Sequence, residues 1–253
     1  MDCLDIIHRT LLSLDVAQER VQEFFATDEE CIAQLVALNE ECSPAIESVA
    51  RGMLRDAQQE GNEYKLQVLI RVMYQRQQSC VLSFVSEALL AAQTIDKEVY
   101  VSFLSEIGDP RVAQPLLQFA ASVAPSEPDE EPTGEGWALV KALEGLRYYR
   151  MKDAIPIALA HLADSSDRVR RAAHDLITEL DAKNAAPNVL AQIAREGDPD
   201  NAIAMIRTLV NWRYRPAFFE FRRLLETGTM AGSAAVRDVL KDAIETLSED
   251  TAG

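Results

Sequence analysis

The sequence predicts an all-α fold, an α-solenoid made of antiparallel helix pairs. First, three segments at 153–162, 184–193 and 215–224 follow nearly the same plan at intervals of about 31 residues. Second, apolar residues recur at helical spacing, and no stretch shows the two-residue alternation of strands joined by hairpin turns. A repeat period of 20 to 50 residues is typical of stacked-repeat proteins, in which each unit buries its apolar face against its neighbours.

The helix pairs are clearest in the second half of the chain. Each of the three aligned segments is expected to form the second helix of a pair, with Pro156 or Pro187 near its start, where a missing N–H costs little. An apolar stripe marks each first helix and recurs about 33 residues later: Val169, Ala172, Ala173, Leu176 and Ile177 are followed by Ala202, Met205, Ile206, Leu209 and Val210. Residues 234–247 predict a C-terminal capping helix.

The same plan extends back to about residue 96, through a turn before Pro115. An acidic, proline-rich insertion at about 124–136 interrupts it and is interpreted as an exposed loop. Residues 1–95 form an irregular N-terminal helical array, with helices expected at 2–14, 16–25, 29–38, 43–59, 63–77 and 80–92. We expect the repeats of 96–253 and this array to form one continuous solenoid.

The net charge of −16 is distributed unevenly. Residues 1–126 carry 9 Lys/Arg against 19 Asp/Glu, 127–136 carry five acids and no base, and 137–253 carry 16 bases against 17 acids. Such an acidic chain is repelled by phosphate backbones, so nucleic acid is not an expected partner. No apolar run reaches the roughly 18 residues of a membrane span. The acidic start lacks the basic region of a signal peptide, so we expect a cytoplasmic protein.

Cysteine and histidine residues show no site pattern. The four cysteines have no CxxC spacing, and we expect all of them to be reduced: Cys3, Cys31, Cys42 and Cys80. The three histidines lack the spacing of zinc ligands: His8, His161 and His174. Asp5 with His8 and His174 with Asp175 are neighbours, but neither pair has a nucleophile beside it. We therefore expect no catalytic residue, metal or cofactor, although an enzymatic role stays open.

The turn between the two helices of each pair is rich in basic and aromatic residues. In a stacked repeat these turns lie along one edge, and Arg and aromatic side chains dominate binding hot spots. The expected partner-binding residues are Arg147, Arg150, Lys152, Lys183, Trp212, Arg213, Tyr214 and Arg215, with Tyr148 and Tyr149 beside them. An acidic peptide or helix would bind there. The alternative is that the aromatic residues complete the helix-pair cores while the arginines are only solvated.

Two further charge features have simpler interpretations. Arg168, Arg170 and Arg171 stand at the start of a helix, where basic residues oppose the helix dipole. We interpret them as part of a charge network with Asp164, Asp167 and Asp175. The acidity of the N-terminal half indicates a basic protein partner as an alternative to the acidic one.

Two motifs resemble HEAT-like repeats, particularly the short type found in phycobilisome lyases. Ile107-Gly-Asp-Pro-Arg-Val-Ala-Gln-Pro-Leu-Leu117 resembles the core of such a repeat, and Asp167-Arg-Val-Arg-Arg-Ala-Ala173 resembles the link between repeats. The resemblance implies a right-handed superhelix that serves as a protein-binding scaffold or adaptor. Its alternative is a bilin-lyase-like enzyme or enzyme subunit. HEAT-like deoxyhypusine hydroxylases need repeated His-Glu ligands, and this sequence has no His-Glu dipeptide.

Overall fold

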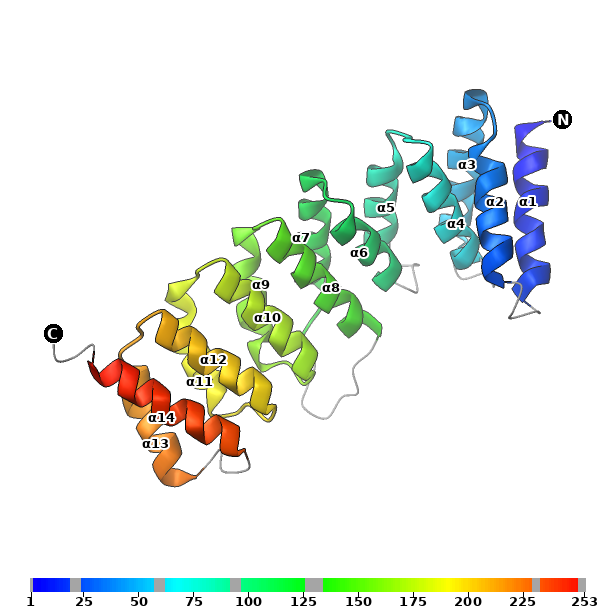
Figure 1. The fold of residues 1–253 in the computed structure, drawn as a ribbon. Helices are drawn as coiled ribbons and strands as arrows, with labels where there is room; N and C mark the ends of the chain where they lie inside the picture. Colours follow the sequence, from blue (N-terminus) through cyan, green and yellow to red (C-terminus); the bar gives the residue numbers. More distant parts are fainter. Residues whose placement is uncertain are drawn as a thin grey trace. The chain divides into compact units, whose positions relative to one another are not determined.

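The computed structural model describes residues 2–18, 24–56, 62–91, 97–125, 134–228 and 233–249. Within these residues all regular structure is α-helix or short 3₁₀ helix, without any strand, which confirms the all-α class (Figure 1). The chain divides into two compact units, Met1–Pro115 and Leu116–Gly253, and we describe each separately. The boundary expected from the repeats, at residues 95 and 96, falls inside the first unit.

The first unit is built from consecutive helices that pack in pairs. Helix α1 packs on α2, α3 on α4, and α5 on α6, while α2 also contacts α4. The elements are α1 (Cys3–Gln18), α2 (Phe24–Val36), η1 (Glu40–Cys42), α3 (Ser43–Arg55), α4 (Asn62–Gln75), α5 (Val81–Leu90), α6 (Lys97–Glu106) and η2 (Pro110–Val112). Helix α7 (Ala113–Ser122) crosses the boundary between the units.

The largest differences from the predicted helices of the first unit lie between α1 and α2 and at the end of α3. The separate helix expected at 16–25 is wrong, because α1 continues to Gln18 and α2 begins at Phe24, with 19–23 outside the described residues. No glycine or proline lies between Leu14 and Val16 to end the first helix there. Helix α3 ends at Arg55, four residues before the predicted end.

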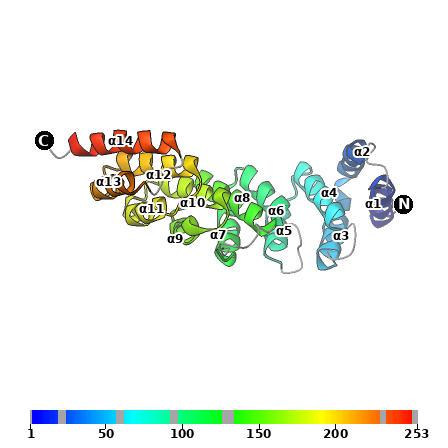
Figure 2. The ribbon, with the colours of Figure 1, turned by 90° about the horizontal axis from the view of Figure 1, so that it is seen from below.

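The second unit has two layers of helices, which Figure 2 shows one above the other. One layer holds α8 (Gly134–Tyr148), α10 (Asp167–Glu179), α12 (Pro199–Asn211) and α14 (Ala234–Glu249). The other holds α9 (Ile155–Ala160), α11 (Ala186–Ile193) and α13 (Ala217–Thr227). Within the first layer each helix contacts the next, and α10, α12 and α14 also pack against the second layer.

Small and branched apolar residues fill the core of the second unit. The predicted stripes of α10 and α12 are buried, except that Val210 is only half-buried. The capping helix expected at 234–247 is present as α14. Most of the acidic insertion expected at 124–136 lies outside the described residues, and its last part, from Gly134, already belongs to α8.

Within the described ranges one turn recurs five times, and each copy contains a residue in the left-handed conformation. In each copy the residue after the left-handed one accepts, with its carbonyl, a hydrogen bond from the N–H three residues further along, where the next helix starts. An example is Ala154 N–H to Met151 O (3.1 Å). The left-handed residues stand 31, 42, 31 and 32 positions apart: Gln77, Gly108, Arg150, Asp181 and Arg213. The first copy lies within the segment 1–95, which the sequence indicated to be irregular.

A second hydrogen bond closes the preceding helix in four of these turns. The N–H after the left-handed residue donates to the carbonyl five positions earlier, as in Met151 to Leu146 (2.9 Å) and Tyr214 to Leu209 (2.9 Å). The equivalent bonds join Gln78 to Met73 (3.0 Å) and Ala182 to Ile177 (3.1 Å). This is the Schellman arrangement, in which a left-handed residue satisfies the last carbonyls of a helix. The turn therefore reverses the chain in the same way at these four copies.

Candidate partner-binding surface

Helices α8 and α10 run in the same direction, as their side-chain contacts show. Near their N-terminal ends the Arg168 guanidinium lies 4.2 Å from the centre of the Trp137 ring. Near their C-terminal ends Arg147 lies 3.7 Å from Asp175. The N-terminal end of one helix contacts the N-terminal end of the other, and the same holds for the C-terminal ends, so the two helices are parallel. The residues in contact are about one repeat apart in the sequence.

Helices α10 and α12 are parallel for the same reason. The Asn201 amide donates to the Asp167 carbonyl (2.9 Å) at the start of both helices. Toward their ends, His174 Nε2 lies 3.1 Å from the hydroxyl of Thr208. The C-termini of α8, α10 and α12 therefore point to one edge of the unit, and so do the turns that follow them.

This edge carries five of the residues that the sequence predicted for partner binding. Its basic side chains, which we call the basic edge, are Arg150, Lys152, Lys183, Arg213 and Arg215, and all five are exposed. Lys183 lies 3.5 Å from the carboxylate of Asp181 in the same turn, so its charge is partly neutralised.

The aromatic residues of these turns are placed in two ways. Tyr148 is 69% exposed and contacts the Tyr149 ring edge-on, with 5.2 Å between the ring centres. Trp212 and Tyr214 are half-buried at the end of α12. The first turn thus has an exposed aromatic residue two positions before Arg150 in the sequence, whereas Trp212 and Tyr214 are less accessible.

Arg147 does not join the basic edge, because it lies inside α8 on the side that faces α10. It lines a groove of about 410 Å³ between these helices, together with Asn201 at the start of α12. The residues of this α8–α10 groove are Trp137, Val140, Lys141, Glu144, Arg147, Asp167, Arg168, Arg171, Ala172, Asp175 and Asn201. The sequence did not predict this groove. Trp137 and Arg168 are one 31-residue repeat apart, and this spacing could have predicted that they lie side by side on parallel helices.

Asp175 is the electrostatic centre of the groove's far end. Its carboxylate lies 3.1 Å from Arg171 and 3.7 Å from Arg147. Burial tends to raise the pKa of Asp175, but the neighbouring His174 and Arg171 lower it more, so the pKa lies below its ordinary value. Asp175 is therefore an anion that holds two arginines in place.

Arg170 has a structural role, although it lies between two groove residues in the sequence. Its guanidinium donates to Glu196 (2.6 and 2.9 Å) and to the carbonyls of Asp164 and Ser165 (both 2.8 Å). The Arg170 side chain is 12% exposed and that of Glu196 is fully buried. The charge network expected around Arg168–Arg171 is therefore present only in part: Arg171 pairs with Asp175, whereas the carboxylate partner of Arg170 is Glu196, which the sequence did not predict.

The expectation that all four cysteines are reduced is wrong for two of them. Cys3 and Cys42 form a disulfide with 5.5 Å between their Cα atoms, whereas Cys31 and Cys80 are free. Cys3 and Cys42 are 39 residues apart, and no sequence pattern pairs them, because only the packing of α1 against α3 brings them together. Disulfides are rare in the cytosol, so this bond weighs against the cytoplasmic location, which stays a prediction.

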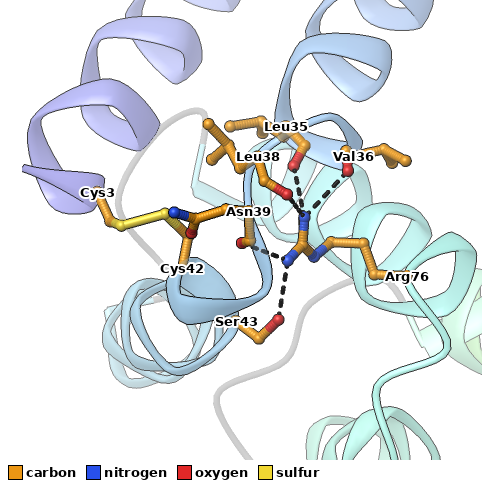
Figure 3. Close-up of a disulfide and its surroundings, with 8 residues drawn as sticks. All are labelled: Cys3, Leu35, Val36, Leu38, Asn39, Cys42, Ser43 and Arg76. Carbon is orange, nitrogen blue, oxygen red and sulfur yellow. Dashed lines mark hydrogen bonds between the residues drawn. A yellow bond between two sulfur atoms is a disulfide. The ribbon is translucent and has the colours of Figure 1, made fainter.

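Figure 3 shows that Arg76 lies close to this disulfide and caps the C-terminal end of helix α2. Its guanidinium donates to the carbonyls of Leu35, Val36, Leu38 and Asn39 and to the hydroxyl of Ser43, at 2.6–3.4 Å. Such bonds satisfy the last carbonyls of a helix. Arg76 is therefore a structural residue of the first unit.

The two histidines of the second unit are buried and hydrogen-bonded within the fold. His161 Nδ1 lies 3.1 Å from Asp164, and His174 bonds to Thr208 between α10 and α12. In the described part of the chain, no cluster of His, Cys, Asp and Glu could hold a metal ion. Among the described helices, none is long and apolar enough to cross a membrane. Comparisons of the chain with protein families, curated proteins and solved structures found no match.

Proposed function

We propose that the chain is a non-enzymatic scaffold or adaptor of the HEAT-like repeat type, which binds a protein partner along the basic edge. One observation carries the proposal: α8, α10 and α12 are parallel, so three turns bring five exposed Lys and Arg side chains to one edge of an otherwise acidic protein. Stacked helical repeats commonly bind partners along extended surfaces of this kind.

The backbone of the basic edge has the conformation of the recurring turn. Arg150 and Arg213 have φ values of 53° and 54°, in the left-handed region. There a side chain other than glycine costs about 1–2 kcal/mol. The equivalent turn at Gly108 has the glycine that suits this conformation. Gln77 and Asp181 share this conformation, so it belongs to the turn and fixes where Arg150 and Arg213 stand on the edge.

The chemistry of the basic edge favours an acidic protein segment. Arginine forms paired hydrogen bonds with carboxylates, and Tyr148, two residues before Arg150, offers an exposed aromatic surface. A nucleic acid would be repelled by the remaining surface, because the whole chain carries a net charge of −16.

The test is a quantitative pull-down from native lysate with the full chain as bait. The wild type is compared with the triple variant Arg150→Glu, Arg213→Glu, Arg215→Glu. A matched control, Arg207→Glu, Arg237→Glu, Lys241→Glu, makes the same charge change at exposed residues of α12 and α14. A partner captured by wild type and control is then purified, and its affinity is measured for all three proteins.

We expect the edge variant to lose such a partner while it keeps the wild-type circular dichroism spectrum. The affinity of the wild type should fall as salt rises, because exposed charges are screened. Equal affinity of the partner for all three proteins would contradict binding at the basic edge. Absence of any protein partner would contradict the scaffold itself.

A further inference from the structure

Arg168 on α10 differs from the other cations of the α8–α10 groove. It is exposed, and its guanidinium covers the Trp137 ring at 4.2 Å. Within the described residues, Lys141, Arg147 and Arg171 each have a carboxylate partner, and Arg168 is the one groove cation without an ion pair. A guanidinium that lies on an aromatic ring loses side-chain freedom while the N–H groups on its edge stay available.

The surroundings of Arg168 extend this feature into an elongated site. Val140 and Ala172 are buried apolar residues of the groove, and Asn201 is held there by its bond to the Asp167 carbonyl. From Trp137 to Arg147 the groove follows ten residues of α8, about 15 Å of helix. This length suits a peptide segment better than a small molecule.

The charges of the groove select the type of anion. Its four cations face three carboxylates: Glu144 pairs with Lys141, Asp175 with Arg147 and Arg171, and Asp167 is next to Arg168 in the sequence. One additional negative charge would balance the site. A phosphate group, with close to two charges, would meet stronger repulsion from the three carboxylates.

We propose that the α8–α10 groove is a second binding site, separate from the basic edge, for an acidic segment of a protein. A Glu or Asp side chain of that segment accepts paired hydrogen bonds from Arg168 while Arg168 lies on Trp137. A neighbouring apolar side chain of the segment packs on Val140 and Ala172.

The experiment starts from a displayed library of random nine-residue peptides, selected on the immobilised full chain. Selected peptides are labelled, and their affinities are measured by fluorescence anisotropy. The variants are Arg168→Gln, Arg168→Lys and Trp137→Leu, and the reference for the other surface is Arg150→Gln with Arg213→Gln. Each selected peptide is also made with Gln in place of Glu, Asn in place of Asp, and phosphoserine in place of the acid.

We expect the selected peptides to be enriched in Asp or Glu next to an apolar residue. Arg168→Gln should weaken their binding about tenfold or more, since a hydrogen bond between charged groups is lost. Arg168→Lys should also weaken it several-fold, because an ammonium group lacks the planar, paired geometry. Trp137→Leu should weaken the binding to a smaller extent. The peptides with Gln or Asn should bind the wild-type chain as weakly as the acidic peptides bind Arg168→Gln.

Three results would overturn the proposal: no enrichment of acidic peptides, stronger binding of the phosphoserine peptides, or equal affinity for wild type and Arg168→Gln. If the Arg150→Gln, Arg213→Gln variant alone lost the binding of acidic peptides, the result would contradict the groove proposal and support binding at the basic edge. If they were lost only in the Arg168 and Trp137 variants, the groove proposal would stand without the basic edge.

Discussion

At the scale of single residues, the left-handed position of the recurring turn is the most informative feature. Among the described residues, five copies of the turn have this conformation, and Gly108 is the glycine among them; Gly228 adopts it as well, at the end of α13. A Cβ atom added at Gly108 would meet nothing within 4 Å. Any effect of a substitution there would therefore come from the backbone conformation and not from a clash.

We expect Gly108→Ala to lower the free energy of unfolding by about 1 kcal/mol, because alanine is strained at positive φ. The reverse change at an equivalent position, Arg150→Gly, should leave the stability unchanged or raise it by up to about 1 kcal/mol. Urea unfolding followed by circular dichroism measures both. A loss of stability in Arg150→Gly would show that the Arg150 side chain stabilises its turn.

At the scale of elements, the Arg170–Glu196 ion pair links neighbouring helix pairs. Arg170 also binds the carbonyls of Asp164 and Ser165, and Glu196 accepts a bond from the N–H of Asp198 (3.0 Å). The loops that precede α10 and α12 are thus joined by one buried network. Such a network is sensitive to removal of one partner, because the other charge is left buried.

Arg170→Met should therefore lower the free energy of unfolding by about 3–5 kcal/mol, since Glu196 stays buried without its partner. The control is Arg171→Met, one residue further along α10. Its ion pair with Asp175 is partly exposed, so its loss should cost at most about 1 kcal/mol. Chemical denaturation of both variants gives the comparison, and equal losses would argue against the network's role.

At the scale of the whole molecule, the two units are stabilised differently. The first contains the Cys3–Cys42 disulfide, which closes 39 residues of chain and joins the start of α1 to η1. The second has a buried histidine hydrogen-bonded between parallel helices: His174 of α10 contacts Thr208 of α12, and Thr178 of α10 contacts His174. Loss of the disulfide should therefore affect the first unit alone.

We expect Cys42→Ser to destabilise the first unit by up to about 4 kcal/mol, because a loop of this length no longer restricts the unfolded chain. Hydrogen exchange followed by mass spectrometry should show faster exchange in α1–α4 and unchanged exchange in α10–α12. Cys80→Ser is the control, since Cys80 is a free thiol. Alkylation of four thiols in the unreduced, denatured protein would show that the bond is absent.

Local patterns in the sequence predicted much of the fold. Apolar spacing identified α10 and α12 and their buried stripes, and the 31-residue period indicated that equivalent turns share an edge. Each of these features depends on residues within one helix or one turn. The helix boundary near Val16 was missed because the residues around it do not stop a helix.

The remaining features depend on which distant residues the fold brings together. The sequence by itself determined the helical class, the repeat period and the basic character of the turns, since these follow from neighbouring residues. Only the tertiary structure paired Cys3 with Cys42 and Arg170 with Glu196, turned Arg147 toward Asp175, and placed Arg168 on Trp137. These contacts join residues 26 to 39 positions apart, and packing between helices decides them.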